Sequence, residues 1–551
     1  MKNTPNILFI NPSPQNEYEQ SHILREQKKK PDGLFLPRRP DLYIPTGIIE
    51  IAAYLRQEIE NISIEVIDVS ALFFGLAKNG NLNQSVTVES FHRNIIDTCE
   101  YKPDIVGISM LLASSLKLSM LIADLVKRKW PNVTVVCGGN HATFDVKNVL
   151  SSSSVDYVIR GEAELSFTEF VKVRMTDENP DGITGVISRD KLQKNLCDEM
   201  SPMLQDLNQL PLPAYDLLDM RLYCAENRTS VMLSRGCVFK CTFCNSHTIH
   251  GAQIRDKPTP KIHQELMHLA SQYKVDHLSI MDDLPGTKKA KFIELLNFTQ
   301  KLGMKVDFPN ALSVAVMNEA LIDALCLAKM EYFTLAIESG SEHVQKHVIN
   351  KRVPLDKAKR LVEYIKGKQK KVITTLILGF PNETKDMREE SIDYYRNLDI
   401  DWVYVLTALP LPGTVLMQQF ESANNIDRSL FDWSSVRHMK RTFDTDEITA
   451  DQLEMLVYDT NVDLNFFNNN NMRKGRYKDA IDMFDYIVLS KYPYHIVGRY
   501  CRGVAFLHLQ KDVEAQDDFN SCINWIKTND ESKRLYHRYK SKMPLLDPIL
   551  T

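Results

Sequence analysis

The stretch Ser234–Asn245 reads SRGCVFKCTFCN and places Cys237, Cys241 and Cys244 in one short loop. The apolar, β-branched residues before it predict a strand that ends where the loop begins. Thiolates are soft ligands that suit iron–sulfur clusters or zinc, and such short spacings let one loop cover one face of a metal centre. Three thiolates on a four-iron cluster leave one iron open, and that open position can bind a further molecule.

Zinc is the alternative metal for this loop. A structural zinc site needs four protein ligands, and the loop supplies three. His247 and His250 follow closely in the sequence and are the candidates for a fourth ligand. Sequence alone therefore leaves both metals open, with ligand number favouring a cluster.

The sequence around the loop alternates strands and helices. Residues 228–430 predict six strand–helix repeats, enough for a partial (β/α)6 barrel. Residues 1–200 show the same alternation and predict a doubly wound parallel sheet of the Rossmann type, an α/β fold. The predicted strands are Ile7–Ile10, Ser63–Val69, Ile105–Ser109, Thr134–Cys137, Tyr157–Ile159, Ser230–Ser234, His277–Met281, Val306–Phe308, Tyr332–Ile337, Val372–Leu378 and Trp402–Ala408.

Two further segments complete the predicted domain organisation. Residues 201–227 contain the proline-punctuated LPLPAYDLLD and form a linker. Residues 431–551 predict an all-helical C-terminal domain. Within it, Tyr477–Val488 and Asp512–Ile523 align at a spacing that weakly resembles tetratricopeptide repeats. Two such units are fewer than a solenoid needs, so a helical cap on the barrel and a surface for a protein partner both remain open.

Composition excludes several classes of protein. The chain has 551 residues, 44% of them hydrophobic, and a formal net charge of −4. This balance gives no reason to expect nucleic acid as a partner. No run is long and apolar enough for a membrane span, and the N-terminus lacks a cleavable signal, so we expect a cytoplasmic protein. A disulfide framework is not expected among its 10 cysteines.

The cysteine spacing, with Phe243 as the aromatic before the last cysteine, resembles the signature of the radical S-adenosylmethionine (SAM) superfamily. The resemblance implies that Cys237, Cys241 and Cys244 hold a 4Fe-4S cluster whose open iron chelates SAM. It further implies reductive cleavage of SAM to a 5′-deoxyadenosyl radical that abstracts hydrogen from substrate. An electron donor such as flavodoxin or ferredoxin would then be a partner.

Motifs further along the chain fit the same family in the expected order, each at the end of a predicted strand. SIMDDLPG offers two acids, AIESGSE resembles the fourth-strand motif, LILGFPNET resembles the fifth-strand motif, and PLPGT closes the sixth strand. The two acids, Asp282 and Asp283, are also the candidates for a catalytic role. The SAM-binding residues implied by the resemblance are Phe243, Asp282, Asp283, Glu338, Ser339, Gly379 and Pro381.

The first domain carries its own ligand signals at two strand ends. Ser109 and Leu111 follow the third predicted strand, and Gly138-Gly139 follows the fourth. Open parallel sheets bind ligands at the carboxyl ends of their strands, and glycines there let backbone approach a ligand. A Gly-Gly pair alone is more often a tight turn.

These residues resemble the cobalamin-binding domains of corrinoid-dependent enzymes, and the likeness extends over residues 5–420. It implies that Ser109, Leu111, Gly138, Gly139 and His141 contact cobalamin. One departure is the absence of an Asp-x-His-x-x-Gly motif from the first 110 residues. Neither histidine of that stretch, at positions 22 and 92, has the required context, so the lower axial ligand of cobalt is left open.

The combined resemblance predicts a cobalamin-dependent radical SAM enzyme that methylates an unactivated carbon of a peptide, lipid or small metabolite. A cyclase or rearrangement enzyme with the same cofactors, and a radical SAM enzyme with a vestigial cobalamin domain, are the alternatives. A tRNA methylthiotransferase fits poorly because its further cluster cysteines are missing. A non-catalytic scaffold with a structural metal loop is the alternative from outside the enzymes.

Overall fold

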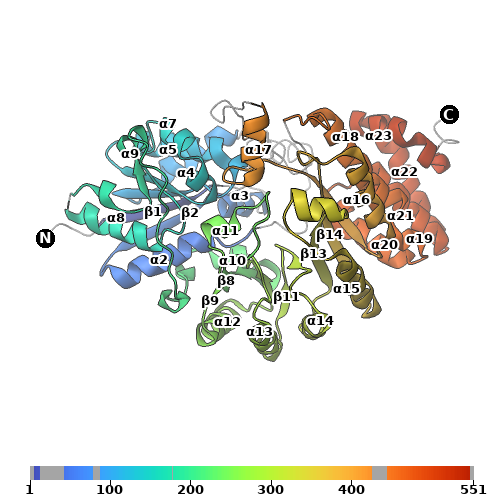
Figure 1. Ribbon diagram of the computed structural model, residues 1–551, viewed down its shortest axis with the longest axis horizontal. Helices are drawn as coiled ribbons and strands as arrows, with labels where there is room; N and C mark the ends of the chain where they lie inside the picture. The colour runs from blue at the N-terminus through green and yellow to red at the C-terminus, as the bar shows by residue number, and fades with distance from the viewer. Residues whose placement is uncertain are drawn as a thin grey trace.

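A computed structural model describes residues 5–12, 42–78, 87–176, 178–424, 433 and 443–546. Figure 1 shows three parts that follow one another along the long axis of the molecule. The first α/β part lies at one end, the barrel strands lie in the middle, and the C-terminal helices lie at the other end. Among the described helices, none has the length and apolar composition to cross a bilayer.

The first part is a six-stranded sheet in the order β2-β1-β3-β4-β5-β6, parallel except for β6. Its first five strands confirm the five predicted ones, and the antiparallel β6 is an addition that the sequence pattern did not predict. The bounds are β1 Asn6–Asn11, β2 Ser63–Asp68, β3 Ile105–Ser109, β4 Thr134–Gly138, β5 Tyr157–Ile159 and β6 Val186–Ser188.

Helices cover both faces of this sheet, because successive strand residues point to opposite sides. On β1, Ile7 and Phe9 pack with α2 and α8, whereas Leu8 and Ile10 pack with α3, α4, α5 and α7. The first face continues into the core of the barrel. The helices are α2 Thr46–Glu58, α3 Val69–Lys78, α4 Val88–Thr98, α5 Leu116–Lys129, α6 Asn140–Phe144, α7 Val146–Ser151, α8 Glu164–Thr176 and α9 Arg189–Gln193.

The middle part contains all six predicted barrel strands, and they run parallel. Their hydrogen bonding divides into two sheets, β11-β10-β7 and β12-β13-β14-β15. The two-residue strand β12 and the antiparallel β8–β9 pair were not predicted, because so short a run carries no periodicity. The bounds are β7 Arg228–Val231, β8 Ser234–Arg235, β9 Arg255–Asp256, β10 His277–Ile280, β11 Lys305–Asp307, β12 Leu312–Ser313, β13 Tyr332–Glu338, β14 Lys371–Leu378 and β15 Trp402–Thr407.

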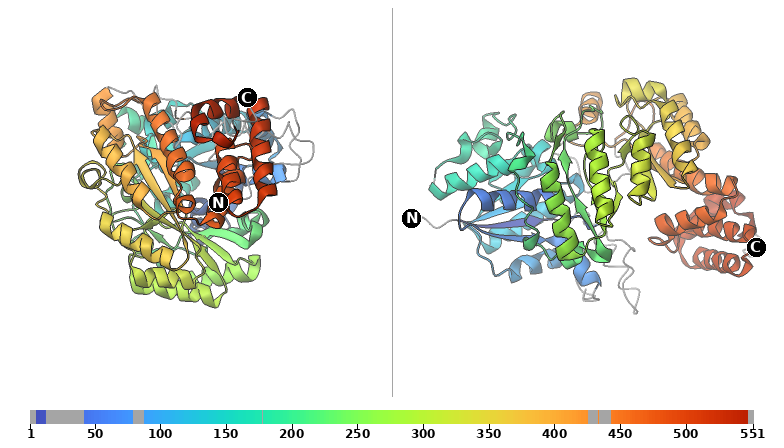
Figure 2. Two further views of the ribbon diagram at one scale, coloured as in Figure 1. Left: turned by 90° about the vertical axis from the view of Figure 1, so that its right-hand side faces the viewer. Right: turned by 90° about the horizontal axis from the view of Figure 1, so that it is seen from below.

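Helices return the chain between the barrel strands and form its outer layer, as Figure 2 shows from below. The two short helices α10 and α11 flank β7 and β8 in the sequence. The bounds are α10 Met220–Tyr223, α11 Ser246–Ile249, α12 Thr259–Tyr273, α13 Lys289–Lys301, α14 Glu319–Leu327, α15 Leu355–Gly367, α16 Lys385–Asn397 and α17 Val415–Asn424.

The C-terminal helices cover the edge of the barrel sheet. Asn465, fully buried, donates to the carbonyl of Val403 at 2.8 Å and accepts from its amide at 2.9 Å, so it occupies the place of a further strand on β15. Trp402 and Ile373 belong to the same apolar core as these helices. The helices are α18 Ala450–Val462, α19 Asn470–Arg473, α20 Tyr477–Met483, α21 Ile496–His508, α22 Asp512–Thr528 and α23 Asp530–Tyr539.

The predicted fold class is confirmed: a doubly wound sheet, a partial barrel and a helical C-terminal region. The paired positions of the weak repeat, Ala480 with Ala515 and Phe484 with Phe519, are all buried in one core. The packing against β15 therefore favours the helical cap over a free-standing repeat. The boundary placed between residues 430 and 431 and the histidine at position 22 lie outside the described residues.

Candidate functional site

The three cysteines form a loop that starts at a strained turn. Gly236 has φ of +105°, and a Cβ there would stand 2.3 Å from the carbonyl oxygen of Gln253. Only glycine fits this turn, which directs Cys237 away from β8. Cys241 is buried, and Cys237 and Cys244 are half-buried.

Backbone hydrogen bonds hold the loop against other barrel elements. The Thr242 amide donates to the carbonyl of Ile349 at 3.0 Å, and its own carbonyl accepts from the amide of Leu416 at 2.8 Å. The Cys237 amide donates to Gly251 at 3.1 Å. The loop is therefore fixed by the segment before β9 and by the segments that follow β13 and β15, as a preorganised ligand set requires.

The described side chains do not form a mononuclear metal site. No group of three or more His, Cys, Asp or Glu side chains in the described part of the chain is arranged to hold a single ion. His250, one of the two candidate fourth ligands, has its Nδ1 2.8 Å from Glu162 Oε1. Three cysteine ligands in one loop fit a four-iron cluster, in which each thiolate binds a different iron.

Asp282 and Asp283, at the end of β10, both contact the strand that leads into the loop. Asp282 accepts from the Leu233 amide at 2.7 Å and from the Ser234 hydroxyl at 2.6 Å. Asp283 accepts from the Gly236 amide at 3.1 Å. Burial raises the pKa of Asp282 to about 6, against these hydrogen bonds. Each oxygen of Asp282 therefore accepts a hydrogen bond from the segment that leads into the loop.

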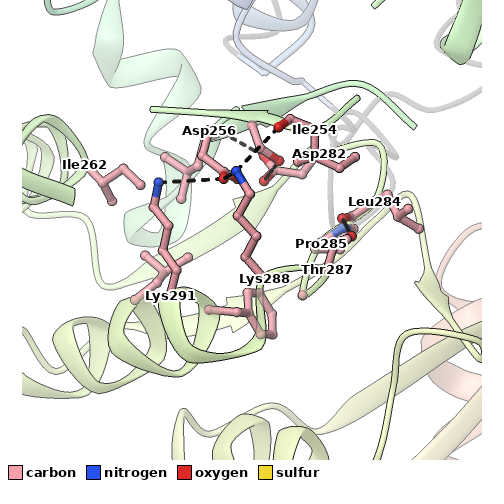
Figure 3. A pocket seen from close by; sticks show the side chains of 14 residues that line it. Ile254, Asp256, Ile262, Asp282, Leu284, Pro285, Thr287, Lys288 and Lys291 are labelled. Carbon is pink, nitrogen blue, oxygen red and sulfur yellow. Dashed lines mark hydrogen bonds and ion pairs between the residues drawn. The ribbon is translucent and has the colours of Figure 1, made fainter. Parts of the chain in front are cut away.

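Asp282 also borders the small pocket drawn in Figure 3. Beside it, Lys288 pairs with Asp256 at 2.6 Å, and Lys291 points to the same carboxylate. The pocket lies between β8–β9 and the start of α13. Both lysines of the pocket contact Asp256, and Asp282 bonds the segment before the cysteine loop. The pocket is therefore part of the structure that supports the loop.

Glu338, at the end of β13, lies in a strained backbone conformation with φ of +75°. It accepts a hydrogen bond from Lys351 Nζ at 2.7 Å, and both side chains are buried. Lys351 also lowers the pKa of the Cys241 thiol, which burial raises to about 12. A buried cation beside a buried ligand thiol favours the thiolate that iron binds. Sequence reasoning missed Lys351, because nothing in its motif context marks it.

The loop after β14 meets the cysteine loop through aromatic contact. Phe243 and Phe380 have ring centroids 6.0 Å apart. Gly379, with φ of +88°, and Phe380 both donate their amides to the buried carboxylate of Glu383, at 2.5 and 3.2 Å. The LILGFPNET motif thus forms a closed turn beside the cysteines, with Pro381 inside it. Ser339 is buried, and its hydroxyl lies 2.9 Å from that of Ser391.

The ligand signals of the first domain meet at the carboxyl ends of β3 and β4. The Met110 amide donates to the carbonyl of Gly138 at 2.7 Å. A Cβ on Gly139, whose φ is +96°, would stand 2.9 Å from the carbonyl oxygen of Met110. This close approach requires glycine. Leu111 is 58% exposed, an apolar side chain left uncovered beside the sheet's strand-order reversal.

His141 is 3% exposed, and neither ring nitrogen has a hydrogen-bond partner among the described residues. Its Nε2 lies 3.5 Å from the Asp145 carboxylate, and its ring lies 5.8 Å from that of Trp433. Burial lowers the pKa of His141 to about 4, so the ring is neutral at pH 7. Buried polar atoms without a hydrogen-bond partner are uncommon in native proteins, so the Nδ1 atom of His141 is the one that needs an explanation.

The two candidate sites are joined by a pair of amide side chains. Asn245, directly after Cys244, donates to Asn140 Oδ1 at 2.9 Å, and Asn140 donates back at 3.3 Å. Asn245 also donates to the carbonyl of Pro412 at 3.2 Å. Asn140 directly follows the Gly-Gly turn. The loop for the cluster and the turn of the first domain are therefore in direct contact.

A buried ion-pair network reinforces this junction, and sequence reasoning missed it. Arg235, two residues before Cys237, is 5% exposed and pairs with three glutamates of the first domain. The distances are 2.5 Å to Glu50, 3.0 Å to Glu162 and 2.6 Å to Glu164. Further pairs extend the network: Arg255 with Glu162, and Lys257 with both Glu50 and Glu265.

Comparison with known protein families identifies both parts. The model of the radical SAM superfamily matches residues 231–395, and the model of the B12 binding domain matches residues 39–171. Residues 231–395 are therefore a radical SAM domain, and residues 39–171 are a B12 binding domain. These two domains imply a 4Fe-4S cluster, SAM and cobalamin as cofactors. The cysteine loop and the uncovered edge of the first sheet fit these groups.

Curated relatives include methyltransferases and a cyclase. An uncharacterized methyltransferase of Pyrococcus horikoshii is 27% identical over 75% of this chain and 86% of its own. Cytidylyl-2-hydroxyethylphosphonate methyltransferase of Streptomyces wedmorensis is 26% identical over 58% of this chain and 67% of its own. Anaerobic magnesium-protoporphyrin IX monomethyl ester cyclase of Rubrivivax gelatinosus is 24% identical, and each chain is covered to 58%.

Solved structures share the fold. The radical S-adenosylmethionine methyltransferase TsrM of Kitasatospora setae aligns with a TM-score of 0.57 at 14% identity, covering 77% of each chain. The cobalamin-dependent S-adenosylmethionine radical enzyme OxsB aligns with a TM-score of 0.58 at 14% identity, covering 98% of this chain and 75% of its own. The match to OxsB extends through the helical C-terminal part.

Proposed function

We propose that the protein is a cobalamin-dependent radical SAM methyltransferase that acts on a poorly nucleophilic position, such as an unactivated carbon. The direct contact between the cysteine loop and the Gly-Gly turn, through Asn140 and Asn245, carries the proposal. A reaction that needs two cofactors at one atom requires their sites to face each other. Two methyltransferases among the relatives support the same assignment.

The site residues divide between the two halves. Cys237, Cys241 and Cys244 would hold the cluster, and the strand-end segments around them would hold SAM. Contacts to SAM would come from Phe243, Asp283, Glu338, Ser339, Gly379 and Pro381, with Asp282 fixing the strand behind the loop. On the other side, Ser109, Leu111, Gly138, Gly139 and His141 would contact cobalamin.

The cofactors, when bound, supply one-electron cleavage of SAM and a transferable methyl group. The side chains of the protein supply the surroundings in which the cofactors are held. Lys351 places a buried positive charge between Glu338 and the ligand thiol of Cys241. Phe243 and Phe380, with the apolar cluster around them, exclude water on one side of the cysteine loop.

Two products of SAM test the proposal without knowledge of the substrate. After anaerobic reconstitution with iron, sulfide and hydroxocobalamin, the protein should contain about four irons and one corrinoid per chain. With dithionite and SAM it should release 5′-deoxyadenosine, through the cluster. It should also release S-adenosylhomocysteine in a corrinoid-dependent manner. A cyclase predicts the first product without the second, and a structural zinc site predicts neither.

Cys241→Ala provides the variant and Cys326→Ala its matched control. Cys326 is also partly buried, but it lies on α14, away from the loop. The first variant should lose iron and 5′-deoxyadenosine formation, whereas the second should retain both. Equal iron content in the two variants would contradict the assignment of the loop.

A further inference from the structure

Exposed cations without ion-pair partners surround the outer side of the cysteine loop. Val238, directly after Cys237, is 47% exposed, and Lys240 beside it is exposed too. The carbonyl of Lys240 accepts a hydrogen bond from Asn350 at 3.2 Å, which brings the segment after β13 against the loop. That segment carries the exposed Lys346 and Arg352.

The backbone of the segment holds its two cations close to each other. The Arg352 amide donates to the carbonyl of Gln345, the neighbour of Lys346, at 3.0 Å. In the described part of the chain, no acidic side chain forms an ion pair with Lys240, Lys346 or Arg352. The three positive charges are therefore exposed to solvent without a described ion-pair partner.

A second group of cations continues this surface at the start of α15. Lys357 has its pKa lowered by burial and then by the nearby Lys289 and Arg360. These three side chains belong to the beginnings of α13 and α15, which follow β10 and β13 at the same end of the barrel as the cysteine loop. None of the three has an ion-pair partner among the described residues. Mutual repulsion of this kind favours a ligand that brings negative charge.

The same segment also carries two exposed acids, Glu342 and Asp356. Both raise the pKa of Tyr394, so they lie near α16. The chain as a whole carries a formal net charge of −4. The cation surface, defined as Lys240, Lys346, Arg352, Lys289, Lys357 and Arg360, is therefore a local reversal of the overall charge. Such a reversal guides an acidic partner to one place.

We propose that the cation surface docks an acidic one-electron donor protein that reduces the cluster. This rests on the proposed function, since only a redox-active cluster needs an external electron. Val238 and Lys240 lie within the cysteine loop itself, so a protein docked here would stand over the cluster's ligands. Redox partners bind through small, transient interfaces in which complementary charge sets the encounter rate, and this surface has that character. The electron passes from the reduced donor to the oxidised cluster, and no covalent bond changes in that step.

The experiment compares two reductants on full-length reconstituted protein. Reduced flavodoxin is an acidic protein probe, and dithionite is a small reductant that needs no docking surface. The variant is Lys346→Glu/Arg352→Glu, which reverses two charges outside the ligand loop. The matched control is Lys301→Glu/Lys305→Glu, which reverses two exposed charges at the opposite end of the barrel. Cluster reduction and 5′-deoxyadenosine formation are the readouts.

We expect the variant to slow both flavodoxin-driven rates about 10-fold or more, in line with the 10- to 1,000-fold range of electrostatic steering. Its dithionite-driven rates should stay within about 2-fold of the unmodified protein, as should all rates of the control. Raising the ionic strength from about 0.01 to about 0.15 M shortens the Debye length from about 30 to about 8 Å and should slow only the flavodoxin reaction of the unmodified protein.

Three results would overturn the proposal. Unchanged flavodoxin-driven rates in the variant would show that the surface serves something else, such as an anionic substrate. An equal loss with dithionite would place the effect on the cluster or the fold. No 5′-deoxyadenosine from the unmodified protein with dithionite would remove the proposed function as well, and this outcome is distinct from the first two.

Discussion

Replacing Arg235 by methionine should open the junction between the first domain and the barrel. The guanidinium of Arg235 is the only cation that contacts Glu50, Glu162 and Glu164 together among the described residues. Methionine keeps a similar length but removes the charge. Lys257 and Arg255 remain to balance Glu50 and Glu162, whereas Glu164 loses the ion-pair partner described for it.

Removing one partner of a buried ion pair costs about 3–5 kcal/mol, because the remaining charge stays buried. At 1.36 kcal/mol per decade, that cost raises the open population of the junction by about two to four orders of magnitude. Native-state proteolysis measures this population when opening is fast relative to cleavage. Thermolysin should therefore cut Arg235→Met at the linker, residues 201–227, at least about 100 times faster than the unmodified protein.

Arg221→Met is the matched control. Arg221 pairs with Asp219 at 2.7 Å, a distance like those of Arg235, but its side chain is 89% exposed. Exposed ion pairs contribute little to stability, so this variant should be cut less than about 5-fold faster. If both variants behave alike, or if Arg235→Met changes cleavage less than 5-fold, the network does not hold the junction and the argument fails.

Three further predictions follow from named contacts. Asn465→Ala leaves the buried amide and carbonyl of Val403 unpaired and should lower the free energy of unfolding by about 2–4 kcal/mol in urea titrations. The control Asn468→Ala removes an exposed hydrogen bond to Asp463 and should change that free energy by less than about 0.5 kcal/mol. Asp282→Asn should stabilise the protein by up to about 3 kcal/mol above pH 6, because a carboxyl with a raised pKa opposes folding once it ionises. The gain in stability should shrink as the pH falls toward 4, and a difference between the melting curves that does not depend on pH would contradict this. The junction should be most stable between pH of about 4.5 and about 10.5, because folding lowers the pKa values of the Glu50 and Glu162 carboxyls and raises that of the Lys257 ammonium. A rate of proteolysis that is unchanged at pH 3.5 would be evidence against the network.

The strands and the cysteine loop could be predicted from sequence because each is a local signal. Buried strands of a parallel sheet are short apolar runs, and all eleven predicted runs form strands. The loop is a fixed spacing of three residues of one kind. The motifs after the loop supported the same prediction, because each of them follows the end of a strand, where the functional groups of a parallel barrel lie.

The pairing of charged residues could not be predicted. Glu50 and Arg235 are 185 positions apart, and in the sequence each resembles an ordinary surface residue of an amphipathic element. The same holds for Lys351, which becomes significant only because β13 brings Glu338 beside it. For Asp282 and Ser339 the motifs predict SAM contacts, and these stay predictions. The structure adds hydrogen bonds within the protein that the motifs did not indicate.

The buried network bears on how the two domains work together. Burying four carboxylates and three cations costs several kcal/mol per ion, and this cost is offset only while all partners stay in place. A junction of this kind does not open by small degrees, because any partial opening leaves buried charges unpaired. The turn after Gly139 and the loop of Cys237 are therefore held at one fixed separation. A reaction that draws on two cofactors at a single atom depends on such fixed geometry, since a displacement of about 1 Å can cost about 100-fold in rate.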